Sequence, residues 1–74
     1  MERLEKYFAW LVSCSRSQAD LFQKAELAVK QAGHTFSTMF VVSDQKWAEW
    51  DVPEGIVLQI RMGKAKFKSI EASV

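Results

Sequence analysis

Hydrophobic residues in the first half of the chain recur at the three- and four-residue spacing of an amphipathic helix. Over residues 17–32 they fall at i, i+4, i+7, i+8 and i+11, on one helical stripe: Leu21, Ala25, Ala28, Val29 and Ala32. Ser17 precedes Asp20 by three residues, as in a capping box, and Gly33 supplies the left-handed residue that commonly ends a helix. We therefore predict a helix over residues 17–32.

A second helical stripe lies nearer the N-terminus, over residues 4–13, and consists of Leu4, Tyr7, Phe8, Leu11 and Val12. The segment YFAWLV within it is also rich in aromatic and branched residues, which suit a buried strand. We favour a helix, because the preceding MERLEK is helix-forming and carries no turn signal. A strand over the same residues is the alternative.

Beyond the second predicted helix the helical stripe disappears. Residues 35–43 are rich in β-branched and aromatic residues and predict a strand. Its apolar side chains would point to both faces, one carrying Phe36, Phe40 and Val42 and the other carrying Met39 and Val41. Such a strand is either covered on both faces or keeps one face for a partner.

Residues 44–50, DQKWAEW, predict a short turn of helix, capped by Asp44, that brings Trp47 and Trp50 to one side. The Pro-Glu-Gly sequence at 53–55 is typical of a turn. This short helical turn would connect the first predicted strand to the rest of the sheet.

Residues 56–69 alternate between apolar and polar positions around Gly63 and Lys64, a pair typical of a type II′ hairpin turn. Closing the turn there puts these apolar residues on one face: Ile56, Leu58, Ile60, Met62, Ala65 and Phe67. The predicted architecture is an α+β fold, two N-terminal helices packed on a three-stranded antiparallel meander in the order α-α-β-β-β. If residues 4–13 form a strand, the order becomes β-α-β-β-β.

Length and composition agree with one small domain spanning residues 1–74. Hydrophobic residues make up 49 % of the chain, enough for a core, and a homodimer is an option, because pairing with a second copy would add stability to so short a chain. Cys14 is the single cysteine, which excludes an intramolecular disulfide and indicates a reducing compartment. With neither a signal segment nor a membrane-length apolar run, we expect a cytoplasmic protein that does not enter membranes.

Charge is unevenly distributed along the chain. Residues 55–74 carry four cations against Glu71, a net charge of +3, whereas residues 1–54 carry six cations against eight acids, a net charge of −2. The four cations, Arg61, Lys64, Lys66 and Lys68, would lie on the outer face and tip of the hairpin. They are candidates for binding nucleic-acid phosphates or an acidic partner, or they protect an edge strand from pairing. Lysine outnumbers arginine three to one, which disfavours base readout.

The tryptophans are candidates for binding a protein. Trp47 and Trp50 lie in an acidic segment, and Trp10 falls off the centre of its helical stripe. Tryptophan is enriched at the energetic centres of interfaces. Together with the second face of the predicted strand, the candidate partner-binding residues are Trp10, Met39, Val41, Trp47 and Trp50.

Catalysis is disfavoured, since His34 is the only histidine and no metal-ligand spacing, phosphate-binding loop or paired carboxylates occur. We predict no cofactor and no metal. The stretch SQADL, residues 17–21, resembles the start of the first helix in phage-repressor helix-turn-helix domains, but no turn glycine interrupts residues 18–32.

The sequence therefore favours a small non-enzymatic protein-interaction module. It would be an adaptor, inhibitor or modulator of a larger protein, of the kind phages and mobile elements also encode. Self-association is a further option. The alternative is a nucleic-acid-binding protein that uses the basic 61–68 hairpin.

Overall fold

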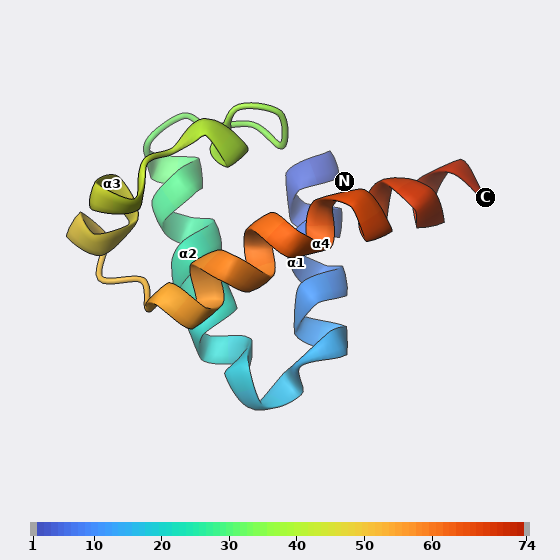
Figure 1. The fold of residues 1–74 in the computed structure, drawn as a ribbon, viewed down its shortest axis with the longest axis horizontal. Helices are drawn as coiled ribbons and strands as arrows, with labels where there is room; N and C mark the ends of the chain where they lie inside the picture. The colour runs from blue at the N-terminus through green and yellow to red at the C-terminus, as the bar shows by residue number, and fades with distance from the viewer. Residues whose placement is uncertain (1, 74) are drawn as a thin grey trace.

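The computed structural model describes residues 2–73, and every regular element in that range is helical. The α-helices are α1 (Arg3–Cys14), α2 (Ala19–Gln31), α3 (Asp44–Glu49) and α4 (Glu54–Ala72), and two 3-10 turns, η1 (Arg16–Gln18) and η2 (Met39–Val41), lie between them. Helices α1 and α2 run antiparallel, and α4 crosses both of them (Figure 1). The predicted α+β meander is therefore wrong, and so is the β-α-β-β-β alternative.

The helix predicted for residues 4–13 is confirmed as α1, which buries Leu4, Tyr7, Phe8 and Leu11 at i, i+3, i+4 and i+7. One stripe of its surface thus faces the core, as expected for an amphipathic helix. The strand alternative fails because the aromatic residues of this segment are needed on one side of the chain, where only a helix can collect them.

The predicted second helix is confirmed as α2, although its start differs from the prediction. Ser17 lies inside η1 and does not cap α2, whose N-cap residue, Gln18, makes no side-chain capping bond. The end agrees with the prediction: Gly33 has a φ of 81°, its N–H donates to the Lys30 carbonyl at 3.0 Å, and the His34 N–H donates to the Val29 carbonyl at 2.9 Å. This pair of bonds is a Schellman motif, which satisfies the last carbonyls of the helix.

Residues 35–43 do not form the predicted strand. They begin with a turn, in which the Thr35 N–H donates to the Thr38 side-chain oxygen at 2.8 Å, and they continue into η2. The buried residues Phe36, Met39 and Val42 recur every third position, which is the 3-10 period. The predicted faces were therefore wrong: Met39 lies with Phe36 and Val42 in the core.

The short helical turn predicted at residues 44–50 is confirmed as α3, but its cap lies one residue earlier. The Ser43 side-chain oxygen accepts a bond from the Lys46 N–H at 3.2 Å, while Asp44 is the first residue of the helix. Trp47 and Trp50 do share a side, with ring centroids 5.3 Å apart. Their burial differs, because Trp47 is in the core and Trp50 is half-buried.

Residues 56–68 form part of the 19-residue helix α4, so the predicted hairpin is wrong. The side chains that α4 buries, Ile56, Val57, Ile60 and Phe67, fall at i, i+1, i+4 and i+11, a helical stripe. Gly63 lies on this stripe and does not form a turn. Pro53 also has a different role, because it is the N-cap residue of α4.

Gly63 lies where α4 packs tightly against α1. A Cβ atom at this position would lie 2.8 Å from the Tyr7 hydroxyl oxygen, 3.0 Å from the Trp10 ring and 3.4 Å from a Leu11 methyl group. The Tyr7 hydroxyl donates a hydrogen bond to the Ile60 carbonyl. The absence of a side chain at residue 63 therefore lets the two helices pack together.

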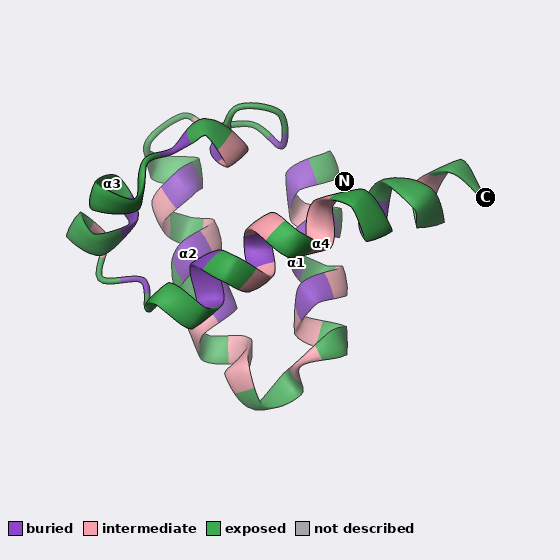
Figure 2. Ribbon diagram, viewed as in Figure 1, coloured by how far each residue is buried: buried purple, intermediate pink, exposed green. Residues whose placement is uncertain are grey.

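The core lies where α1, α2 and α4 face one another, and their inward surfaces are buried in Figure 2. Tyr7 is central to it, with the Phe36 and Phe67 ring centroids 5.2 and 5.0 Å from its own. The last turns of α4 extend beyond the bundle and are mostly exposed (Figure 2). There Arg3 binds Glu71 with a shortest N–O distance of 2.6 Å, which ties the start of α1 to the end of α4.

Candidate interaction surface on helix α4

The side of α4 that points away from the core carries two large apolar side chains. Leu58 is 48 % exposed and Met62 is 77 % exposed, and they lie one helical turn apart. Exposed Ala65 and Ser69 continue the same line at i+7 and i+11 from Leu58. We call this line of four residues the outer face of α4. It is the reverse of the side that packs on α1.

A groove runs beside the outer face, between α4 and the C-terminal end of α1, and encloses about 240 Å³. We call it the α1–α4 groove. Eight residues line it: Trp10, Leu11, Cys14, Ser15, Gln59, Met62, Gly63 and Lys66. Met62 belongs both to this groove and to the outer face of α4. The apolar surface of the outer face is thus continuous with a concave site.

Two contacts fix the polar wall of the α1–α4 groove. The Gln59 side-chain nitrogen donates to the Gln18 side-chain oxygen at 2.7 Å, and the Ser15 hydroxyl donates to the Gln59 side-chain oxygen at 3.3 Å. On the apolar side, the Trp10 ring stacks on Tyr7 with centroids 5.9 Å apart and an interplanar angle of 26°. The groove is therefore held in shape before anything binds.

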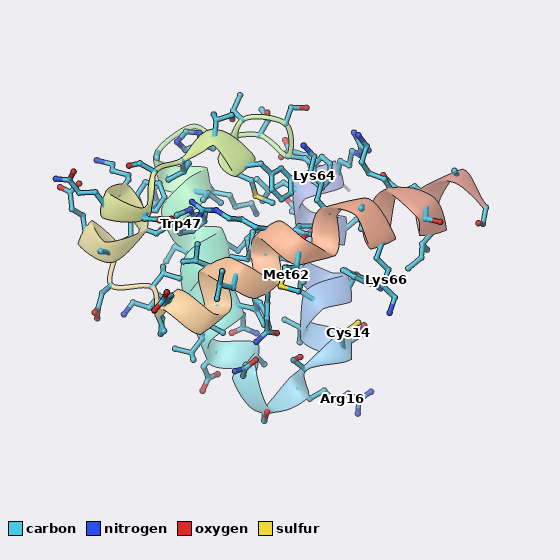
Figure 3. The ribbon with its side chains drawn as sticks, viewed as in Figure 1. Cys14, Arg16, Trp47, Met62, Lys64 and Lys66 are labelled. Atoms are coloured by element: carbon cyan, nitrogen blue, oxygen red, sulfur yellow. The ribbon has the colours of Figure 1, made fainter. Side chains whose placement is uncertain are left out.

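The charge around this groove is positive. Lys66 is its one charged lining residue, no carboxylate lines it, and Arg16 follows the lining residue Ser15 in the chain. Figure 3 shows Lys66, Cys14 and Arg16 along the same edge of the molecule, with Met62 above Cys14 on α4. An anionic group approaching this edge would meet two cations.

The four predicted cations do not form one surface, because Lys66 lies on the other side of α4 from Arg61, Lys64 and Lys68, which fall at i, i+3 and i+7. Arg61 binds Asp44 and also donates to the Val42 carbonyl at 3.0 Å, so it ties α4 to α3. The Lys64 ammonium lies 4.7 Å from the centroid of the Phe40 ring. Lys64 and Lys66 point to opposite sides of α4 (Figure 3), and Lys68 is exposed near the C-terminal end. Only Lys66 lines the groove.

The predicted partner-binding residues also separate in the fold. Met39 is fully buried and Trp47 is 1 % exposed, so both belong to the core and neither is available to a partner of the folded chain. Trp10 is half-buried and lines the α1–α4 groove. Val41 is 81 % exposed but lies on η2 and does not line the α1–α4 groove.

Trp50 lines a different, larger depression of about 430 Å³ against α2, together with Lys24, Leu27, Ala28, Gln31 and Ala32. Leu27 is 57 % exposed there. The Lys46 ammonium lies 5.8 Å from the centroid of the Trp50 ring. This depression is the alternative candidate surface for binding a partner.

Sequence reasoning missed Leu58 and Met62 as surface residues, since the hairpin placed both on its core-facing side. Their four-residue separation was the available signal. Once Ile56 and Ile60 are assigned to the buried side of a helix, Leu58 and Met62 fall on the opposite side. Cys14 was not among the predicted site residues, and the fold places its exposed thiol in the groove.

The titratable side chain in the core has a structural role. Burial raises the pKa of the Tyr7 hydroxyl well above its ordinary value, and that hydroxyl is occupied by the Ile60 carbonyl. Among residues 2–73, no three His, Cys, Asp or Glu side chains come together as a metal-binding group. None of the helices described is both long enough and apolar enough to span a bilayer.

Comparison of the chain with protein-family models, with curated proteins and with solved structures finds no match.

Proposed function

We propose that this protein is a small non-enzymatic protein-interaction module that binds its partner with the outer face of α4 and the α1–α4 groove. The observation that carries the proposal is Met62, a large apolar side chain that is 77 % exposed in the middle of an ordered helix and borders a concave site. The expected location is the cytoplasm, where the exposed Cys14 thiol stays reduced.

Folding of the chain does not require apolar side chains on the outer face of α4. The opposite side of the helix supplies the buried residues, and a polar residue at position 58 or 62 would leave those contacts intact. Apolar surface that borders a groove is typical of a binding site, and methionine adapts its shape to different partners. Leu58 and Met62 have no role in the core, and binding a partner would explain why these positions are apolar.

The nucleic-acid alternative has less support from the geometry. Phosphate binding along a backbone needs several cations on one face. Here Arg61, Lys64 and Lys68 share a face of α4, but Arg61 is engaged by Asp44 and Lys64 lies over Phe40. Lys66 lies on the other side of the helix from Lys64 (Figure 3). The helical arrangement thus leaves Lys66 and Lys68 as the exposed cations of the original four.

Site-specific photo-crosslinking tests the proposal directly. A photo-reactive phenylalanine derivative replaces Leu58, and the chain is irradiated in nuclease-treated lysate of its source organism. The control places the same group at Gln45, an exposed residue of α3. We expect a discrete protein adduct from position 58 and none from position 45.

The Met62→Glu substitution, added to the Leu58 probe, should abolish this adduct while the circular dichroism spectrum stays helical. An adduct of twice the chain mass would identify a second copy as the partner. The proposal fails if position 58 gives no protein adduct, or if Met62→Glu leaves the adduct unchanged.

A further inference from the structure

We propose that the segment received by the α1–α4 groove is an acidic peptide with apolar anchor residues. This inference rests on the proposed function and adds the chemistry of the partner to it. Three observations support it: the size of the groove, the charge at its edge, and the net charge of α4.

The groove is the right size for side chains. Its volume of about 240 Å³ falls below the roughly 300–1,000 Å³ of typical small-molecule sites. Trp10, Leu11 and Met62 give it apolar walls, and Gly63 adds no side chain to its floor. Such a site accepts one or two apolar residues of an extended or helical segment, as in other grooves that bind peptides.

The cations at the groove are free to meet carboxylates from outside. Elsewhere in residues 2–73 the ion pairs are internal, and their cations are Arg3, Lys24, Lys30 and Arg61. Lys66 and Arg16 form no ion pair within that part of the chain, and both are exposed. Opposite charge across an interface raises the association rate and selects the partner.

The charge of α4 disfavours a second copy of the chain as the occupant of this site. The helix carries four cations against Glu54 and Glu71, a net charge of +2. A two-fold interface places the same surface on both sides, so two copies would meet with like charges from Lys66 and with no carboxylate in either groove lining to offset them. An acidic partner removes this repulsion.

Peptide selection tests the inference. The folded chain is panned against a phage library of random twelve-residue peptides, and enriched peptides are synthesised with a fluorescent label. We expect the enriched sequences to combine Asp or Glu with large apolar residues. Fluorescence anisotropy then gives the affinity of the best peptide and of the same peptide with its carboxylates replaced by amides, which should bind several-fold more weakly.

Matched variants locate the binding site. Met62→Glu and Lys66→Glu should each weaken peptide binding by about tenfold or more, since Met62→Glu replaces an apolar contact with a like charge and Lys66→Glu replaces an attractive charge with a repulsive one. Val41→Glu and Lys46→Glu make the same changes of chemistry on η2 and α3 and should leave the affinity unchanged. Raising the salt concentration from about 50 to about 500 mM should weaken binding several-fold.

The results separate the two proposals. Enriched peptides that lack acidic residues but still require Met62 would overturn the acidic chemistry and leave the proposed function standing. Peptides that respond to Val41→Glu and not to Met62→Glu would overturn the groove as the site. If no peptide is enriched and position 58 yields no adduct, both proposals fail. The inference would also be refuted if anionic vesicles or random DNA duplex displaced the peptide at concentrations below the Kd of the peptide.

Discussion

The crossing of α1 and α4 allows a sharp prediction, because Gly63 combines a helix-disfavouring residue with a close contact. Replacing Gly63 with alanine has two opposing effects. In an open helix the change would stabilise the protein by about 0.5–1 kcal/mol. Here the new Cβ would lie 2.8 Å from the Tyr7 hydroxyl oxygen and 3.0 Å from the Trp10 ring, so at least one buried contact has to move.

The second effect is the larger one. Overfilling a packed site costs about 1–3 kcal/mol, and displacing Tyr7 also weakens its hydrogen bond to the Ile60 carbonyl. We therefore expect Gly63→Ala to lower the free energy of unfolding by about 1 kcal/mol net, which lowers Tm by about 4–8 °C in a domain of this size. In a Tyr7→Phe background, where the nearest clashing atom is absent, the same substitution should cost less.

The assay is thermal and urea unfolding followed by circular dichroism of the helical signal. Gly55→Ala is the matched control, because it lies in the same helix and a Cβ there would meet nothing within 4 Å. Gly55→Ala should be neutral or stabilising, opposite in sign to Gly63→Ala. If Gly63→Ala proves as stable as the wild type or more so, the close approach of the two helices is refuted.

Three further outcomes follow from individual contacts. Because burial raises the pKa of Tyr7, the folded state keeps the phenolic proton above pH 10.0, where the unfolded state loses it, and the free energy of unfolding should fall as pH rises past 10.0. Tyrosinate absorbance at about 295 nm should appear only on unfolding, and Tyr7→Phe should flatten the pH dependence of stability. The hydrogen bond from Arg3 lowers the pKa of Glu71 from 4.5, so the Arg3–Glu71 pair stabilises the fold above that pH and ceases to do so on acidification. Glu71→Gln should therefore reduce the fall of Tm between about pH 5 and pH 3. Ser43→Ala removes the side-chain bond to the Lys46 N–H and should cost about 1 kcal/mol in urea unfolding, whereas Ser43→Asp should restore stability.

The helices of the first half could be predicted from the sequence because their apolar residues recur at three- and four-residue spacings over several turns. The stripe predicted for the second helix contained Ala25 and Val29, which α2 buries together with Phe22, a residue that the predicted stripe left out. Gly33 marks the end of the helix by a conformation that glycine favours. The start of α2 was less predictable. Ser17 had a suitable spacing to Asp20, but the chain enters the helix through the 3-10 turn η1, which leaves that side chain outside the helix.

The second half was misread because two periods fit the same residues. Between positions 56 and 62 apolar residues occupy every even position, which favours a strand, while Ile56, Val57 and Ile60 also lie on one helical stripe. Gly63 then looked like a hairpin turn. Its true role depends on Tyr7, more than fifty residues away, and no local pattern reports such a contact.

The helix-forming composition of residues 59–68, rich in Lys, Ala, Gln, Met and Arg, was the signal that deserved more weight. The candidate site was missed for the same reason as the fold. In the predicted hairpin Met62 faces the core, whereas in the helix it faces solvent. Assigning the two-residue spacing of a strand to a helical segment therefore placed an exposed residue in the core. Trp10 was identified as a candidate because its position off the helical stripe depends only on α1.

The hydrogen bond between Tyr7 and Ile60 spans 53 positions of the chain, and this separation has a consequence for the order of assembly. Closing a flexible loop of that length costs roughly 3.5 kcal/mol of chain entropy, whereas the α1–α2 pair closes across a few residues. We expect α1 and α2 to associate early and α4 to dock late, in the step that limits the folding rate. Substitutions at the α1–α4 crossing should then slow folding, while those between α1 and α2 should leave the slow step largely unchanged.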